Sequence, residues 1–154
     1  MNAPASALGG KVLKQSLPVL QPPVPLSAPA LKRLQLAQGE LAQFYDDADG
    51  IRYIAFIELR EGGVRGNHYH KVKEEFVYVI DGEALLLAQE PGTRERVELP
   101  LQAGDLAWIQ TGIAHAMRTR KPGRAIEFSK ARFDPRDIYP HQLTNEEGKM
   151  MKDE

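Results

Sequence analysis

From Ile51 to Phe133 the chain is a series of short runs rich in β-branched, aromatic and leucine residues, each ended by turn residues. The runs are Ile51 to Leu59, Glu75 to Ile80, Ala84 to Ala88, Arg94 to Leu99, Leu106 to Gln110, Ala114 to Arg118 and Ala125 to Phe133. The breaks are Gly62-Gly63, Asp81-Gly82, Pro91-Gly92, Ala103-Gly104, Thr111-Gly112 and Pro122-Gly123. Such spacing, with no helical period between the runs, is typical of antiparallel sandwiches and barrels. The sequence therefore predicts an all-β domain.

The segments on either side of these runs have a different composition. Six of the eleven prolines fall before residue 31, which disfavours helices and central strands there. We expect a flexible or extended proline-rich arm over residues 1–30, a single barrel domain over 31–140 and a charged tail over 141–154. Residues 30–43 fit a short helix or an edge strand, and the region after Asp134 is expected to be a loop with a short helix.

The composition limits the partners and the chemistry. The 154 residues include 20 Lys and Arg against 21 Asp and Glu, a net charge of −1, so no basic field favours nucleic acid. No apolar stretch is long enough to span a membrane, and no signal peptide pattern opens the chain, so we expect a cytoplasmic protein. Because there is no cysteine, any metal site must use imidazole, carboxylate or water.

Three of the four histidines lie where they could form one site. His68 and His70 are two residues apart, and in a strand residues i and i+2 face the same side. Glu75 follows in the same block, and His115 lies in a second block after Thr111-Gly112.

These two blocks resemble the paired motifs of the cupin superfamily. The first runs from Gly62 through His68, His70 and Glu75 to Gly82, and the second from Gly104 through His115 to Thr119. Gln110 and Thr119 depart from the usual proline and asparagine. The resemblance implies a double-stranded β-helix, or jelly-roll, barrel in which His68, His70, Glu75 and His115 bind one metal ion.

Three imidazoles and one carboxylate suit one divalent transition metal ion, namely Fe, Mn, Ni, Co, Cu or Zn, and suit calcium poorly. On an octahedral metal they leave two positions for a small-molecule ligand, water or dioxygen. On zinc they could instead complete a tetrahedral site.

The segment from Val64 to His70 has a narrower resemblance to nucleotide-sugar 3,5-epimerases and related keto-isomerases, and to cupin domains of capsular polysaccharide biosynthesis proteins. It implies that His68 removes a proton beside a sugar ketone and that Arg65 meets the diphosphate. The epimerases usually have a residue that is not a ligand at the position of His70, and they often lack metal.

The catalytic residue is left open between several candidates. His68 can be the base only if it is not a metal ligand; otherwise Tyr53, Tyr78 or Glu127 must supply it. The leading function is a keto-sugar epimerase or isomerase. The alternatives are a metal-dependent dioxygenase or lyase, and a ligand-binding protein without catalysis.

The strand that contains Glu75 also predicts which residues line the barrel. If Glu75 points inward, so do Val77 and Val79, whereas Phe76, Tyr78 and Ile80 form an apolar outer face that needs a cover. A second subunit or the proline-rich arm could cover it, so we predict a homodimer. Trp108 is expected to fill the core or line the cavity. His141 fits no motif and is expected at the surface, unless the tail folds over the barrel mouth.

Overall fold

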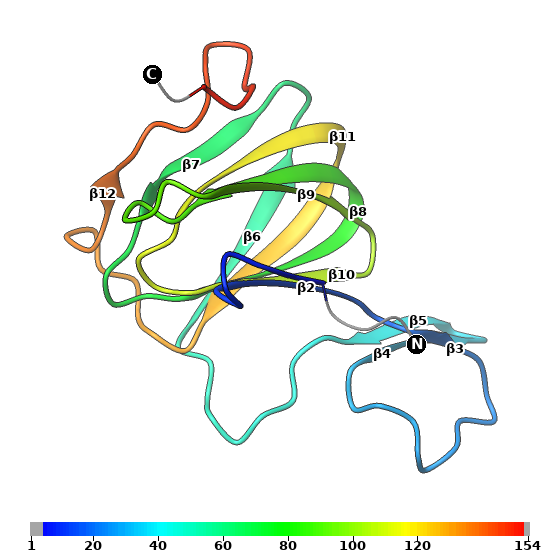
Figure 1. Cartoon of the computed structure of the whole chain (residues 1–154). Coiled ribbons are helices and arrows are strands. Elements are labelled where there is room, and N and C mark those ends of the chain that lie inside the picture. The colour runs from blue at the N-terminus through cyan, green and yellow to red at the C-terminus, as the bar shows by residue number, and fades with distance from the viewer. Residues whose placement is uncertain (1–4, 153–154) are drawn as a thin grey trace.

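A computed structural model describes residues 5–152 (Figure 1). The strands are β1 (Ala5–Ala7), β2 (Val12–Ser16), β3 (Val19–Leu20), β4 (Lys32–Leu36), β5 (Gly39–Gln43), β6 (Tyr53–Leu59), β7 (Val64–Tyr69), β8 (Glu75–Gln89), β9 (Arg96–Gln102), β10 (Asp105–Ile109), β11 (Ala114–Ser129) and β12 (Tyr139–Pro140). Residues 5–152 contain no helix, and therefore none that could cross a membrane.

The long strands fold into an all-β jelly-roll barrel, as predicted. Its hydrogen-bonded order is β1-β2-β10-β8-β11-β7-β12, with β6 added to β11 and β9 added to β8. Neighbouring strands of this sheet are antiparallel. A separate small sheet, β3-β4-β5, stands away from the barrel (Figure 1).

Two predicted turns are instead corners within continuous strands. Asp81-Gly82 lies inside β8 and Pro122-Gly123 inside β11, and the register between the two strands shifts between Thr119 and Ala125. Gly82 has a φ of +81°, and a Cβ on Gly123 would lie 2.1 Å from the carbonyl oxygen of Asp81. The glycines thus let both strands bend around the barrel instead of ending it.

The region before residue 51 differs from the predicted arm. Strand β2 pairs with β10 along five residues, and Leu8 and Val12 are buried in the barrel core. Residues 30–43, left open between a helix and an edge strand, form the β4-β5 hairpin. The prolines exclude helix here, but they do not prevent residues 12–16, which contain none, from pairing with the barrel.

The region after Asp134 also packs on the barrel. It has no helix among its described residues, contrary to the short helix expected there. Strand β12 pairs with β7, and the backbone N–H groups of Leu143 and Thr144 donate to Oδ1 of Asn67 at 2.9 and 3.2 Å. Leu143 is buried in a cluster with Leu85 and Leu87, so the segment is anchored by apolar contacts despite its charges.

The alternation along β8 separates two cores, as the sequence predicted. Val77 and Val79 belong to the barrel interior, whereas Tyr78 lies in an outer cluster with Phe128. The described part of the chain covers this outer face with its own Phe44, whose ring stacks on Tyr78 at 4.3 Å.

Candidate functional site

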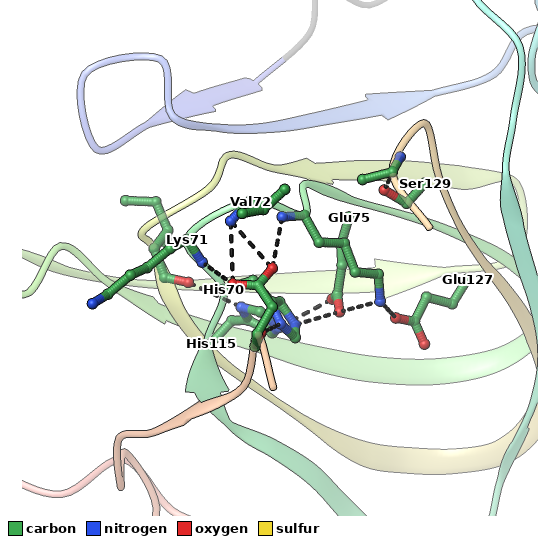
Figure 2. A network of polar contacts seen from close by, with 11 residues as sticks. His70, Lys71, Val72, Glu75, His115, Glu127 and Ser129 are labelled. Atoms are coloured by element: carbon green, nitrogen blue, oxygen red, sulfur yellow. Dashed lines mark hydrogen bonds and ion pairs between the residues drawn. The ribbon is translucent and has the colours of Figure 1, made fainter. Parts of the chain in front are cut away.

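The four residues predicted to form one site lie together at one end of the barrel interior. One nitrogen or oxygen atom from each of His68, His70, Glu75 and His115 lies within 4.8 Å of the others. The ring centroids are 4.7 Å apart for His68 and His70 and 5.0 Å for His68 and His115. Figure 2 shows the side chains of Glu75 and His115 converging with that of His70. Their role as metal ligands stays a prediction.

An irregularity in β7 brings His68 opposite His115. His68 pairs with His115 and Gly66 with Ala116, which leaves Asn67 as an extra residue in β7. A Cβ on Gly66, whose φ is +92°, would lie 2.7 Å from the carbonyl oxygen of His115. Glycine at this position therefore permits the close approach of β7 and β11 that builds the site.

Two of the imidazoles are held by backbone carbonyls. Nδ1 of His70 lies 2.7 Å from the carbonyl oxygen of Asp137, and Nδ1 of His115 lies 3.0 Å from that of Ile113. Because a carbonyl oxygen only accepts, each Nδ1 carries hydrogen. In the neutral ring Nε2 is then an acceptor, and both Nε2 atoms face Glu75, at 3.1 Å from Oε1 and 3.0 Å from Oε2 respectively.

This arrangement requires a positive charge or a proton between the rings and the carboxylate. No described residue gives Nε2 of His115 a hydrogen bond of good geometry. Metal-binding histidines are commonly fixed in this way, with the second ring nitrogen donating to a carbonyl. The chain's own residues therefore fit a divalent transition metal, and in its place a proton can be shared with Glu75.

A buried lysine extends the site, and the sequence reasoning missed it. Nζ of Lys73 lies 3.3 Å from Oε1 of Glu75 and 2.8 Å from Oε1 of Glu127. The ammonium also lies 4.5 Å from the centroid of the Tyr53 ring, which stacks on Phe133. Lys73 lies in the turn before β8, so the strand alternation used for Val77 does not extend to it.

Asp137 organises the turn that contains this lysine, and no sequence pattern predicts this role. Its carboxylate accepts the backbone N–H groups of Lys71 at 2.8 Å, Val72 at 3.1 Å and Lys73 at 3.0 Å. Burial opposes the charged form, but these donors hold the pKa of Asp137 below its usual value. Since its carbonyl also holds His70, Asp137 positions both a histidine and the lysine.

The charges in the site are strongly interdependent. Burial disfavours the ionised form of Glu75, but His115 and His70 outweigh it and the pKa of Glu75 lies well below its usual range. Burial likewise opposes the charged forms of His115 and Lys73, yet Glu75 raises the pKa of both. Burial and the neighbouring Glu75 raise the pKa of Glu127. Thus Glu75 carries the negative charge and Glu127 is the carboxyl that retains a proton more readily.

His68 differs from the other two histidines because it is only half-buried. Burial, followed by repulsion from His115 and His70, lowers its pKa from 6.5 to about 4. At neutral pH its imidazole is therefore uncharged and can accept a proton.

A cavity of about 140 Å³ lies next to these groups. His68, Glu75, Glu127 and Arg65 line it, together with apolar walls that include Met117. Nη2 of Arg65 donates to the carbonyl oxygen of Glu58 at 3.2 Å, and the side chain is exposed. Tyr53 contacts the site through Lys73, whereas Tyr78 lies on the outer face, so the structure removes it as a base.

His141 and Trp108 lie outside the histidine site. Nε2 of His141 lies 2.8 Å from Oε1 of Gln89, outside the histidine cluster, and the ring is partly buried instead of fully at the surface. Trp108 neither fills the barrel core nor lines the inner cavity. It pairs with Phe76 and lines a separate cavity of about 390 Å³ on the outer face.

Comparison with known proteins identifies the class to which this fold and site belong. The sequence profile described as "Cupin domain" matches residues 55–128, which include all four clustered residues. The barrel over residues 55–128 is therefore a cupin domain. No curated protein sequence matches it closely enough to narrow the family further.

Solved structures that share this fold include enzymes of nucleotide-sugar metabolism. A dTDP-4-dehydrorhamnose 3,5-epimerase from Sulfolobus tokodaii has a TM-score of 0.69 and 17% identity, covering 92% of this chain and 82% of that one. A 3,4-ketoisomerase from Helicobacter canadensis gives 0.63 and 16%, covering 71% and 85%. A mutant 3,4-ketoisomerase from Thermoanaerobacterium thermosaccharolyticum in complex with TDP-4-keto-6-deoxyglucose gives 0.61 and 16%, covering 71% and 82%.

Proposed function

We propose that this protein is an epimerase or isomerase acting on a keto sugar carried by a nucleoside diphosphate, with His68 as the catalytic base. The observation that carries the proposal is a neutral imidazole in a cavity that is also lined by Glu75 and Glu127, the two carboxylates paired with the buried ammonium of Lys73. The imidazole of His68 is uncharged at neutral pH, so it has a free nitrogen to receive a proton from substrate, and Lys73 supplies positive charge beside Glu75 and Glu127. Abstraction of a proton beside a ketone needs both a base and a cation.

The proposed step balances without an oxidant or reductant. The bond between carbon and hydrogen next to the ketone breaks, and the proton passes to Nε2 or Nδ1 of His68. The electron pair forms a carbon–carbon double bond while the ketone oxygen becomes an enolate, and the ammonium of Lys73, behind Glu75 and Glu127 at the cavity wall, offsets the negative charge. To invert that carbon, a second acid delivers a proton to the opposite face, a role open to Glu127 in the same cavity, and His68 passes its own proton to water. Alternatively, His68 gives the same proton back to the substrate. Its return to the former carbonyl carbon, with the neighbouring hydroxyl protonating the enolate oxygen, moves the ketone.

The size of the cavity supports a substrate that is only partly enclosed. Pockets that bury a drug-sized ligand usually measure about 300–1,000 Å³, whereas the inner cavity measures about 140 Å³. A single sugar ring would therefore enter, and the nucleotide would remain outside. The exposed guanidinium of Arg65 at the cavity is suited to a diphosphate group there.

His68, His70, Glu75 and His115 would hold the metal ion if one is bound. A divalent transition metal there would polarise the ketone oxygen. His68 would then be committed as a ligand, and Glu127, which lines the same cavity, would be the base in its place.

Proton exchange in D₂O tests the proposal directly. TDP-4-keto-6-deoxyglucose is incubated with the protein, before and after EDTA treatment, and deuterium at the carbon beside the ketone is followed by NMR. We expect exchange by the wild type in both conditions, and a loss of about 10²–10⁴-fold in His68→Asn. His141→Asn, a histidine outside the site, is the matched control and should retain the wild-type rate.

Two outcomes would count against this assignment. Absence of exchange with this substrate and with dTDP-4-keto-L-rhamnose would overturn the proposed reaction. Exchange that disappears with EDTA and persists in His68→Asn would transfer the role of base to another residue.

A second candidate is a metal-dependent dioxygenase or lyase. The fixed Nδ1–H groups of His70 and His115, which leave both Nε2 atoms facing Glu75, favour it. It predicts iron or manganese in the purified protein by elemental analysis, and no solvent exchange into keto sugars.

A further inference from the structure

The three imidazoles of the site differ in how their rings are held. Nδ1 of His70 and Nδ1 of His115 each donate to a backbone carbonyl oxygen, at 2.7 and 3.0 Å. Within residues 5–152 the ring of His68 forms no hydrogen bond, although it lies against the other two rings. The direction of the His68 ring is therefore set by the backbone that carries it.

That backbone is irregular at the residue before His68. Asn67 is the extra residue in β7 where its register with β11 shifts, and its φ of 58° lies in the left-handed region. Asparagine adopts this conformation more readily than most residues with a side chain. Arg65 and His68 both line the inner cavity although they are three residues apart, which the alternation of a regular strand forbids. The bulge at Asn67 is thus what turns both side chains inward.

Residues 141–144, in the C-terminal region, hold this bulge in place. Oδ1 of Asn67 accepts the backbone N–H groups of Leu143 and Thr144 at 2.9 and 3.2 Å, and Nδ2 of Asn67 donates to Oγ1 of Thr144 at 3.0 Å. The carbonyl oxygen of Asn67 accepts the backbone N–H of His141 at 2.8 Å. Leu143 and Thr144 are 0% and 2% exposed, so the partners of the carboxamide are themselves fixed by burial.

We propose that Asn67 is a positioning residue for proton transfer, and that its carboxamide, held by residues 143–144, keeps the bulge that directs His68 into the cavity. Asn67 does not line the cavity, so it acts through His68 and not by contact with the substrate. A misplacement of about 1 Å in a reacting group can cost about 100-fold in rate. The inference rests on the proposed function for the reaction that it assists, whereas the placement of His68 is a matter of geometry alone.

Substitution of Asn67 tests this role in the proton exchange experiment, run over a range of keto-sugar concentrations. Asn67→Ala removes the carboxamide and disfavours the left-handed backbone. We expect its kcat for exchange to fall by about 10–100-fold and its KM to stay within about twofold of the wild type. Asn67→Asp keeps an acceptor for both N–H groups and tolerates the same backbone, so it should recover most of the lost kcat.

Arg94→Ala is the matched control. Arg94 also has a side chain and a positive φ, of 64°, but it lies in the exposed turn between β8 and β9. Both kinetic constants should therefore equal those of the wild type. Circular dichroism verifies that each variant is folded. Thr144→Val, which removes only the hydroxyl partner of Asn67, serves if Asn67→Ala does not fold, and should lower kcat by about three- to tenfold.

A structural measurement separates the role of Asn67 from the identity of the reaction. In the EDTA-treated protein, nuclear Overhauser effects between the ring protons of His68 and His115 report the direction of His68, because the ring centroids lie 5.0 Å apart. These effects should be strong in the wild type and in Asn67→Asp, and weak in Asn67→Ala. A wild type that exchanges no proton would refute the proposed reaction, and the same effects would still decide the role of Asn67.

Two results would overturn that role. Undiminished effects between the two rings in folded Asn67→Ala, or in Thr144→Val in its place, would show that His68 is directed by other contacts. A raised KM with an unchanged kcat would show that Asn67 acts on substrate binding instead of on the placement of the base.

Discussion

The two faces of β8 differ in character: one buries ionisable groups and the other packs aromatic rings. Its inner face begins at Glu75, where ionisable groups are buried and each charge depends on a neighbour. Its outer face carries Phe76 and Tyr78, whose rings are held by other rings, since Phe76 stacks on Phe128 at 4.9 Å. The outer face therefore stabilises the fold through buried apolar contact area. The inner face lowers stability, because its reactive ionisable groups are kept together away from water.

The largest effect is expected from Phe128→Ala, at the centre of the outer face. The side chain is almost fully buried and contacts Phe76, Phe44 and Tyr45. Loss of this contact area and the cavity left behind should lower the free energy of unfolding by about 4 kcal/mol, measured by urea denaturation. Phe133→Ala, at an exposed phenylalanine, should cost much less. A loss for Phe128→Ala no greater than that of its control would show that the outer face does not supply stability through contact area.

The second effect concerns the buried ammonium on the inner face. Lys73→Met leaves Glu75 and Glu127 facing each other without their shared cation. Removal of one partner from a buried ionic group should lower the free energy of unfolding by about 3 kcal/mol at neutral pH. The loss should shrink as the pH falls and the carboxylates take up protons.

Lys71→Met is the control, because the ammonium of Lys71 lies over the Tyr139 ring outside this network. Denaturation in EDTA keeps metal out of the comparison. Equal losses for both lysines would mean that the inner network is not under the electrostatic constraint described here.

The inner face was also the more predictable of the two at the level of single residues. Strand alternation predicted that His68 and His70 face the same side, whereas the grouping of both with Glu75 and His115 came from the resemblance of the two motifs to those of cupins. Lys73 was missed because it lies in the turn before β8, where strand alternation does not apply. The role of Asp137 could not be predicted from sequence, because it depends on a long-range contact. The loop that contains it packs on the turn at residues 71–73, and Asp137 lies 64 residues after Lys73 in the chain.

The fold was predictable where hydrophobic runs and turn residues agreed, between Ile51 and Phe133. The corners at Gly82 and Gly123 were mistaken for turns because glycine serves both, and only the long-range pairing of β8 with β11 distinguishes them. The pairing of β2 with β10 was missed for a related reason: residues 12–16 have no strong strand pattern and are ordered by the barrel edge they join.

The third prediction tests Asp137 as a positioning residue. Asp137→Asn keeps an acceptor oxygen but loses the charge that three backbone N–H groups stabilise. We expect a loss of about 1–2 kcal/mol in the free energy of unfolding. We also expect a lower rate of proton exchange into the keto sugar, because the turn that holds His70 and Lys73 loosens. Asp134→Asn, at an exposed aspartate three residues earlier, should change neither quantity appreciably; equal effects from both would remove Asp137 from this role.

The smallest expected effect is a pH dependence of the free energy of unfolding that comes from His68. Its pKa in the folded protein is about 4, below the value of 6.5 expected when unfolded, so the folded state binds fewer protons between these two values. Stability should therefore fall as the pH drops from 6.5 towards 4, and His68→Gln removes this contribution.

In EDTA, the free energy of unfolding of His68→Gln should rise relative to the wild type as the pH falls through that window, and the difference should be constant near neutral pH. The half-exposed position of His68 keeps the gain modest, because solvent screens part of the repulsion from His70 and His115. Parallel curves for the two proteins would show that His68 is not held neutral by its neighbours, and would withdraw the property that makes it suitable as a base.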